Sequence, residues 1–369
     1  MNKPAIGREP GSFRIAVLPG DGIGQEVMCA GVEVLRTIES RLESTHFELK
    51  EFSVGAGEYL RGGDPLPAAV FAELKNFDAI LLGAMGLPEV RWPGGVEMTP
   101  QLDLRERLDL YCGLRPVYLY HSADSPLRDR APGSIDILLV RESTEGLFFS
   151  RKEPLAPGAG YAEDKLRITR RGAERVIRAA FREAMGRRRR LSLIDKANVL
   201  PSMAFFRRIF DEIADEFPGV STNRVYVDAA ALYLVQRPEA FDVMLMENMF
   251  GDILSDLAAG LVGGMGVAPS ADIGEDYAVF QPAHGSAPDI AGKGIANPIA
   301  TILSVSMMLE WLGTAETRAA AAMVREAVGA VLADPGARTR DMGSNLTTRQ
   351  MTDLILSAVP AHPRKMVIP

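Results

Sequence analysis

The segment Phe13-Arg14-Ile15-Ala16-Val17-Leu18-Pro19-Gly20-Asp21-Gly22-Ile23-Gly24 decides the fold class. Residues 13–18 form a short apolar run typical of a strand, and the glycine-rich turn after them leads into a helical pattern over residues 25–38. The same alternation returns along the chain. It predicts strands at 47–52, 79–82, 135–140, 191–194, 224–227 and 243–246, and helices at 65–76, 171–185, 201–216 and 249–261. Strands that alternate with helices predict an α/β fold with a parallel or mixed sheet.

The last third of the chain has a different character. Residues 263–298 are rich in glycine and proline, and the sequence from there to about residue 357 is almost entirely helical in pattern. Neither an internal repeat nor a long linker separates it from the rest. A second domain is therefore expected as an insertion in the chain.

Composition limits the classes of function. The chain has 369 residues and a formal net charge of −7, so it has no general excess of basic residues for binding nucleic acid. The run Arg187-Arg188-Arg189-Arg190 is more typical of a solvated helix end than of a nucleic-acid patch. Two cysteines, a polar start and the lack of a long apolar stretch predict a soluble cytoplasmic protein without disulfides.

The turn Gly20-Asp21-Gly22-Ile23-Gly24 follows a strand and opens a helix, as a dinucleotide-binding fingerprint does. Its spacing is G-x-G-x-G, however, and no acidic residue clearly closes a second strand about twenty residues later. A tight turn that needs glycines with positive φ explains the motif equally well.

Two aspartates, Asp252 and Asp256, are four residues apart in an otherwise apolar helical segment. Helical spacing places both carboxylates on one face, where like charges repel. Mg²⁺ or Mn²⁺ would compensate that repulsion, because hard divalent cations prefer carboxylate oxygens. A solvated polar face is the alternative.

Charged residues also follow several apolar strands. Asp228 is expected to end the strand near residue 227, and Lys196 follows the strand at 191–194. The carboxyl ends of strands are where α/β folds place ligands, and a lysine there is a candidate base, with an ordinary surface lysine as the alternative. Arg105, Arg115 and Arg141 lie at the ends of elements and suit a substrate with several carboxylates, provided that the fold brings them together.

Six segments together resemble the isocitrate and isopropylmalate dehydrogenase family, in the family's order and over roughly residues 13–313. The most specific is His284-Gly285-Ser286-Ala287-Pro288-Asp289-Ile290-Ala291-Gly292-Lys293-Gly294-Ile295-Ala296-Asn297-Pro298, which resembles the family's cofactor loop. Residues 247–256 resemble its metal helix, and residues 18–24 its opening turn. Residues 140–142, 195–199 and 227–229 match as well.

The resemblance implies a doubly wound α/β fold with two domains, the larger built from both chain ends. The larger, cofactor-binding domain is expected at residues 1–110 plus 263–369. The smaller domain is expected at residues 111–262, with substrate, metal and dimer contacts.

The resemblance also implies a reaction, the NAD(P)-dependent oxidative decarboxylation of a malate with a substituent at C3. By the family's pattern, Arg105, Arg115 and Arg141 bind the substrate carboxylates. Asp252 and Asp256, with Asp228 from the partner subunit, hold Mg²⁺ or Mn²⁺. Lys196, also from the partner, removes the hydroxyl proton. The protein is therefore expected to be a homodimer with shared active sites.

Cofactor choice is predicted from Asp289, whose carboxylate can accept hydrogen bonds from ribose hydroxyls and would repel a 2′-phosphate. Family members that use NADP carry lysine and tyrosine near this point, so NAD is expected here. The turn at residues 20–24 then lies beside the cofactor rather than around its pyrophosphate. The predicted cofactor-binding residues are His284, Gly285, Ser286, Ala287, Asp289 and Asn297.

The sequence departs from the family in two places. Phe148 occupies the position of the family's catalytic tyrosine, which protonates C3 after decarboxylation. Either water or another acid such as Tyr161 would have to do so, or the overall reaction differs from that of the family. The pocket for the C3 substituent, predicted at Thr99, Gln101 and Leu102, is more polar than the leucine-lined pocket of isopropylmalate enzymes.

These observations predict an NAD-dependent enzyme of the 3-isopropylmalate dehydrogenase type. A tartrate, malate or isocitrate dehydrogenase is the alternative within the class, because of the polar pocket. A non-catalytic regulatory subunit is the alternative from another class: Phe148 favours it, whereas the retained Lys196, Asp228, Asp252 and Asp256 oppose it.

Overall fold

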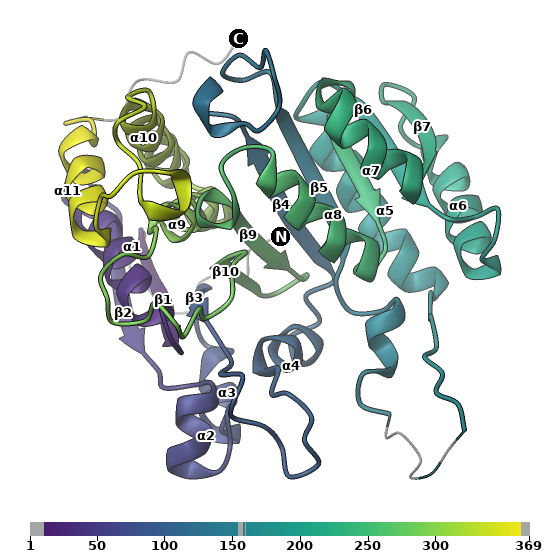
Figure 1. Ribbon diagram of the computed structural model, residues 1–369, viewed down its shortest axis with the longest axis horizontal. Coiled ribbons are helices and arrows are strands. Elements are labelled where there is room, and N and C mark those ends of the chain that lie inside the picture. Colours follow the sequence, from purple (N-terminus) through teal and green to yellow (C-terminus); the bar gives the residue numbers. More distant parts are fainter. Residues whose placement is uncertain (1–10, 154–157, 159, 363–369) are drawn as a thin grey trace.

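The computed structural model describes residues 11–153, 158 and 160–362. Within these residues, ten strands form one sheet (Figure 1). The strands are β1 (Ser12–Gly20), β2 (His46–Glu51), β3 (Ala79–Ala84), β4 (Cys112–Tyr118), β5 (Asp136–Glu142), β6 (Arg190–Asp195), β7 (Ser221–Tyr226), β8 (Val243–Met246), β9 (Pro269–Ile273) and β10 (Ala278–Pro282).

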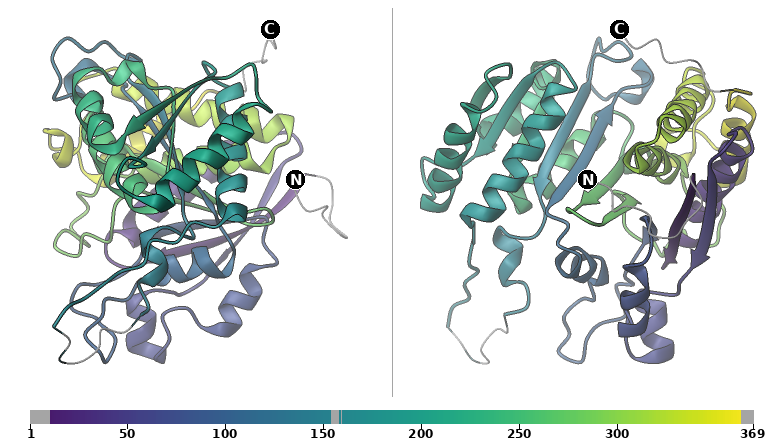
Figure 2. Two further views of the ribbon diagram at one scale, coloured as in Figure 1. Left: turned by 90° about the vertical axis from the view of Figure 1, so that its right-hand side faces the viewer. Right: turned by 180° about the vertical axis from the view of Figure 1, so that it is seen from behind.

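Helices cover both faces of the sheet (Figures 1 and 2). They are α1 (Gly24–Glu39), α2 (Ala56–Gly62), α3 (Ala68–Leu74), α4 (Pro100–Arg107), α5 (Arg170–Met185), α6 (Pro201–Ala214), α7 (Val227–Gln236), α8 (Asn248–Gly260), α9 (Ile299–Leu312), α10 (Ala315–Leu332) and α11 (Thr348–Ala358). None of the helices in the described ranges combines the length and apolar character that a membrane span requires.

The strand order is β2-β1-β3-β10-β9-β4-β5-β8-β6-β7. The pairs β10–β9, β9–β4 and β4–β5 are antiparallel, and the other neighbours are parallel. The first five strands in this order come from the two ends of the chain, and the last five come from residues 111–262. The predicted boundary therefore coincides with the β9–β4 pair, while the division into two domains stays a prediction.

Alternating residues of β5 show how the two faces are built. Leu138 and Val140 share one apolar cluster with α5, whereas Ile137 and Leu139 share another with α8. Successive side chains of a strand point to opposite faces, so α5 and α8 cover β5 from opposite sides. This arrangement confirms the predicted doubly wound α/β fold.

Several predicted elements need correction. The helix expected at 65–76 is the shorter α3, preceded by α2, which the sequence analysis did not predict. Strands β9 and β10 lie inside the stretch that looked only glycine- and proline-rich. Strand β4 was missed because it contains Pro116, which a strand tolerates where one edge is unpaired; β9 pairs only with Cys112 to Leu114 of β4.

The arginine run lies at a helix end, as expected, and Arg188, Arg189 and Arg190 are exposed. It follows the end of α5 and leads into β6. The side chain of Arg187 donates to the carboxylates of Asp136 and Asp242, and Arg188 donates to backbone carbonyl groups. The hydrogen bonds of these two arginines hold the loop between α5 and β6 against the sheet.

Candidate functional site

Three elements bring the predicted substrate-binding arginines together. Arg105 comes from α4, Arg115 from β4 and Arg141 from β5, and all three are buried. Arg115 and Arg141 lie on the α8 face of the sheet, because their neighbours Leu114 and Val140 belong to the opposite apolar cluster. The grouping expected from the sequence is therefore present.

A fully buried carboxylate, Asp272 of β9, lies among these arginines. Its Oδ2 is 2.9 Å from Nε of Arg105, and its Oδ1 is 3.6 Å from a terminal nitrogen of Arg115. Burial opposes its ionisation, but the three guanidinium groups outweigh that effect and hold the pKa of Asp272 below its ordinary value. The arginines are thus partly neutralised and keep positive charge for an anion.

Arg141 is the most strongly desolvated of the three. Burial, followed by repulsion from Arg105, lowers its pKa to about 10, so it stays charged at neutral pH. Its Nε and Nη2 donate to Oδ1 of Asn248 at 3.0 and 2.7 Å, and its Nη1 donates to Asp252. We call these three arginines with Asp272, Asn248, Asp252 and Asp256 the arginine site.

Helix α8 supplies the predicted metal ligands. Glu247 caps its first turn, accepting from the backbone N–H groups of Met249 and Phe250. Burial, followed by repulsion from Asp252, raises the pKa of Asp256 above its ordinary value. The two carboxylates therefore share one helical face, as the four-residue spacing predicts, and their charges are only partly compensated.

Lys196 and Asp228 form a second group. The Nζ of Lys196 donates to Oδ1 of Asp228 at 2.7 Å, and this bond lowers the pKa of Asp228. Lys196 follows β6 as predicted. Asp228, however, lies in the first turn of α7 rather than at the end of a strand, because β7 already ends at Tyr226.

The predicted metal ligands do not meet within one chain. Among the described residues, no three His, Cys, Asp or Glu side chains are grouped closely enough to hold a metal ion. Asp252 and Asp256 lie on α8, while Asp228 is paired with Lys196 on α7. The three predicted carboxylate ligands are therefore not assembled by the described residues of one chain.

The predicted pocket for the C3 substituent lies at the start of α4. Thr99 is the N-cap residue but its side chain forms no capping hydrogen bond. Gln101 and Arg105 are one helical turn apart, hence on one face of α4. The Oε1 of Gln101 is buried without a hydrogen-bond partner among the described residues, whereas Leu102 is partly buried.

The predicted cofactor loop packs against the opening turn. Ile23 N–H donates to the Ser286 carbonyl at 2.8 Å, and Gly22, with φ +57°, lies so close to that carbonyl that a Cβ would be 2.0 Å from its oxygen. The Ser286 hydroxyl donates to the carbonyl of Gly86 at 2.5 Å. The turn is thus a neighbour of the loop, and Ser286 holds the two together.

The other predicted cofactor residues differ in how free their polar atoms are. Burial lowers the pKa of His284, whose Nε2 is buried without a partner. Asn297 uses its amide within the fold, donating to Asp341 and accepting from Ile299 N–H. The remaining three vary in exposure: Gly285 and Asp289 are exposed and Ala287 is partly buried.

Phe148 lies beside the arginine site on a 3-10 helix (Leu147–Ser150). The centre of its ring is 5.4 Å from the guanidinium carbon of Arg141. Tyr161, the alternative acid, is 75% exposed. Of these two aromatic residues, it is therefore Phe148, which has no hydroxyl group, that lies beside Arg141, one of the predicted substrate-binding arginines.

Sequence reasoning missed two residues of the arginine site. Asp272 was hidden in the glycine- and proline-rich stretch, although a lone acidic residue in an apolar strand such as Ser270-Ala271-Asp272 signals a buried charge with partners. Asn248 lies within residues 247–256, which resemble the family's metal helix, but nothing in its spacing indicates that it contacts Arg141.

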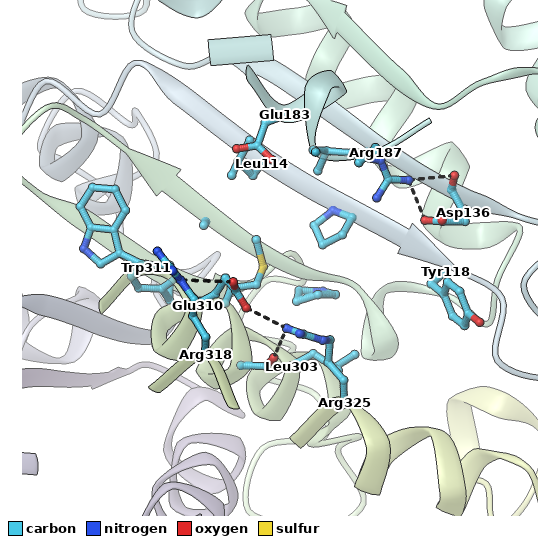
Figure 3. Close-up of a pocket in the computed structure, with 18 of the residues that line it drawn as sticks. Leu114, Tyr118, Asp136, Glu183, Arg187, Leu303, Glu310, Trp311, Arg318 and Arg325 are labelled. Atoms are coloured by element: carbon cyan, nitrogen blue, oxygen red, sulfur yellow. Dashed lines mark hydrogen bonds and ion pairs between the residues drawn. The ribbon is translucent and has the colours of Figure 1, made fainter. Parts of the chain in front are cut away.

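A separate groove of about 1290 Å³ lies between α5 and α9, on the face of the sheet opposite to α8 (Figure 3). We call it the α5–α9 groove. Its floor comes from β4, β5, β9 and β10, and Glu183 and Glu310 lie on its two walls. None of the predicted site residues lines it.

Comparison with known proteins places the chain in a family. Residues 14–355 match the family model for isocitrate/isopropylmalate dehydrogenase. The chain is similar to the 3-isopropylmalate dehydrogenases of Corynebacterium aurimucosum (44% identity, 90% of this chain and 98% of the relative) and Bacillus subtilis (42%, 94% and 97%).

Solved structures agree. The isocitrate dehydrogenase of Methylococcus capsulatus superimposes with a TM-score of 0.85 at 36% identity, covering 94% of this chain and 99% of that chain. A β-decarboxylating dehydrogenase of Thermococcus kodakarensis, in its apo form, has a TM-score of 0.77 at 38% identity, with coverages of 94% and 96%. The chain therefore belongs to the isocitrate/isopropylmalate dehydrogenase family.

Proposed function

We propose that the protein catalyses the NAD-dependent, divalent-metal-dependent oxidative decarboxylation of a 3-substituted malate, as a dehydrogenase of the 3-isopropylmalate type. The observation that carries this proposal is the convergence of Arg105, Arg115 and Arg141 beside the carboxylates of Asp252 and Asp256. Such a site can bind a dicarboxylate and a cation next to each other. The names of the similar proteins support the same type of reaction.

The donor sets fit the two groups that this reaction requires. Asp252 and Asp256 offer hard oxygen ligands one helical turn apart, and their mutual repulsion would be relieved by a divalent cation. The buried Nε2 of His284 lacks a partner and could bond a polar group of NAD. When bound, NAD accepts the hydride from C2, and the cation polarises the C2 oxygen.

The chain's own residues supply orientation and proton transfer. The arginine guanidinium groups would bind the malate carboxylates bidentately and fix C2 and C3 in place. Lys196 would accept the C2 hydroxyl proton as the hydride leaves, with Asp228 holding its ammonium group in position. Loss of the carboxylate from C3 as CO₂ then leaves an enol whose C3 must take up a proton.

We further propose a homodimer with shared active sites. On α7, Asp228, Leu232 and Val235 follow helical spacing, and the two apolar side chains are 52% and 43% exposed. Ile253, on the neighbouring α8 beside Asp252, is 59% exposed. A second copy of the chain covering this face would bury these side chains and bring its Lys196–Asp228 pair to α8.

The function is tested by following NADH formation with Mn²⁺ and a panel of 3-isopropylmalate, tartrate, malate and isocitrate. We expect turnover with at least one of them. Binding of a panel member without any NADH formation would indicate a regulatory subunit instead.

Shared sites are tested by mixing two inactive variants, Lys196→Ala and Asp256→Asn. A mixed dimer contains one site free of both changes only if the two residues come from different subunits. After complete subunit exchange we expect roughly a quarter of the parent activity, since half of the dimers are mixed and each has one intact site. No recovery, with exchange confirmed by mass spectrometry, would contradict the proposal.

A second candidate substrate, one with a polar C3 substituent as in tartrate or isocitrate, is favoured by Gln101. A buried amide oxygen without a partner is costly, and a substrate hydroxyl could donate to it. The solved isocitrate dehydrogenase agrees with this alternative as well. Gln101→Leu should shift kcat/KM by about tenfold or more towards 3-isopropylmalate if the natural substituent is polar.

We also place the enzyme in a reducing compartment, the cytoplasm. Both Cys29 and Cys112 are free thiols, the first exposed and the second buried, which supports this location.

A further inference from the structure

Asn248, the first residue of α8, connects three parts of the arginine site. It is only 2% exposed. Its Oδ1 accepts from both Nε and Nη2 of Arg141, at 3.0 and 2.7 Å. Its Nδ2 donates to the backbone carbonyl of Glu145 at 2.9 Å. Both halves of the amide are therefore used, one on Arg141 and one on the loop that leads to Phe148.

That loop packs tightly against the start of α8. Gly146, with φ +75°, approaches so closely that a Cβ there would lie 2.7 Å from Cβ of Asn248. Phe148 follows two residues later, and its ring faces Arg141. Arg141 thus has both the Asn248 amide and the Phe148 ring as neighbours.

The hydrogen-bond partners of Arg141 differ in whether they would still bond it once a cation binds. Its guanidinium group has five N–H donors, of which two bond Asn248 and one bonds Asp252. The Asp252 side chain is 53% exposed and is the carboxylate that the proposed function assigns to the cation. Once Asp252 binds a cation, Asn248 is the partner that still fixes the guanidinium plane.

We infer that Asn248 is a positioning residue, which holds the guanidinium plane of Arg141 in the orientation needed to bind a substrate carboxylate. The inference rests on the proposed function, because it takes Arg141 to be a substrate contact. A neutral amide suits this task, since it orients the arginine without neutralising the charge that the substrate needs.

The test is a double-mutant cycle on binding, with malate as the probe. The four proteins are the parent, Asn248→Ala, Arg141→Gln and the double variant, and calorimetry gives the malate Kd with Mg²⁺ and without NAD. We expect Asn248→Ala to weaken binding by about 10- to 100-fold in the parent and by less than about twofold in the Arg141→Gln background. Asn223→Ala, at an exposed asparagine of β7, is the matched control and should bind as the parent does.

The outcomes separate the inference from the function. Equal weakening in both backgrounds, or no weakening in either, overturns the positioning role of Asn248. A parent that binds no malate and oxidises no member of the substrate panel overturns the proposed function itself. If Asn248→Ala does not fold, as judged by its circular dichroism and thermal melt, Asn248→Ser takes its place, because the shorter hydroxyl cannot reach both nitrogens of Arg141.

Discussion

The arginine site and the α5–α9 groove lie on opposite faces of the same strands, and they differ in how their polar side chains are paired. In the groove, Glu310 is 3.5 Å from Arg325 and 4.0 Å from Arg318, and Arg187 pairs with Asp136 at 2.7 Å (Figure 3). None of the groove's lining residues, all of which the structure describes, has a buried side-chain nitrogen or oxygen without a hydrogen-bond partner.

Within the described residues, two predicted ligand-binding residues outside the arginine site leave such atoms unsatisfied. Gln101 and His284 each bury a polar atom without a partner, and Asp256 and Asp252 repel each other. Native proteins pair their buried polar groups, so unpaired ones indicate where a ligand completes the structure. Among the described residues, such atoms also occur away from the predicted site, at Arg14 and Ser134 for example. It is therefore the combination of unpaired atoms with repelling carboxylates, rather than the volume of a cavity, that favours this region as the ligand site.

The largest expected difference between the two faces concerns their carboxylates. Asp252→Asn or Asp256→Asn should lower kcat by more than about 10³-fold, because each change removes a proposed ligand of the proposed divalent cation. Glu310→Gln in the groove is the matched control and should stay within about twofold of the parent. NADH formation with saturating Mn²⁺ measures all three. Full turnover of the parent in excess chelator would contradict the metal assignment.

A second difference concerns hydroxyl groups. In the proposed reaction, C3 of the substrate must be protonated by an acid. Phe148, whose ring lies beside Arg141, has no hydroxyl group that could donate this proton. We expect the parent to give a burst of NADH before a slow steady state, and Phe148→Tyr to raise the steady-state rate by about 10- to 100-fold, within the range of a general acid. Tyr120→Phe removes a hydroxyl from the groove and should change neither phase.

Rapid mixing separates this expectation from its alternative. A linear trace in the parent, with Phe148→Tyr no faster, would mean that water or another group already protonates C3. Phe148 would then be a packing residue against Arg141.

Part of the fold and of the candidate site could be predicted from local patterns in the sequence. The alternation of apolar runs and helical patterns identified β1, β5 and α8, because the two strands are continuous apolar runs and the buried residues of α8 recur at helical spacing. The positions of Arg105, Arg115 and Arg141 as candidates came from element ends and from a family resemblance. Their convergence needed the sheet order, in which β9, β4 and β5 become neighbours.

The missed residues depend on contacts between segments far apart in the chain. Asp272 meets Arg105 across 167 positions, and Asn248 meets Arg141 across 107. Local sequence patterns do not indicate contacts between residues so far apart in the chain. Asp228 was misplaced for a smaller reason: the helix α7 begins at once after β7, so the end of the strand and the first helical turn overlap in pattern.

A third and smaller difference concerns the cofactor. Asp289 is exposed on the predicted cofactor loop, and a 2′-phosphate beside it would cost on the order of 1 kcal/mol. The parent should therefore have a kcat/KM for NAD at least about fivefold above that for NADP, and Asp289→Asn should narrow the gap. Glu326→Gln at the groove removes the same charge elsewhere and should leave the ratio unchanged. Equal kcat/KM values in the parent would contradict the role of Asp289.

The smallest effect is expected in the groove itself and concerns stability rather than activity. Glu183 forms no ion pair with any residue that the structure describes, and burial raises its pKa above the ordinary value, with the nearby Arg187 opposing that rise. A carboxyl whose folded pKa is raised binds its proton more tightly in the folded state. Its charge therefore costs folding free energy once the pH exceeds the unfolded pKa, and the full cost applies above the folded pKa.

Glu183→Gln removes this ionisation, so the variant should be more stable than the parent at pH 7, by up to about 1 kcal/mol. The gain should shrink as the pH falls through the folded pKa towards the unfolded one, and it should vanish below about pH 4, where Glu183 is protonated in both states. Urea unfolding at pH 7 and pH 4 measures the two differences, and Glu326→Gln, also at the groove, controls for the loss of a negative charge. A variant less stable than the parent at pH 7, with unchanged activity, would mean that the Glu183 carboxylate has a favourable partner in the groove. The carboxylate of Glu183 would then be paired like the other charged groups of the groove. The groove would differ more clearly from the arginine site in how its charged groups are paired.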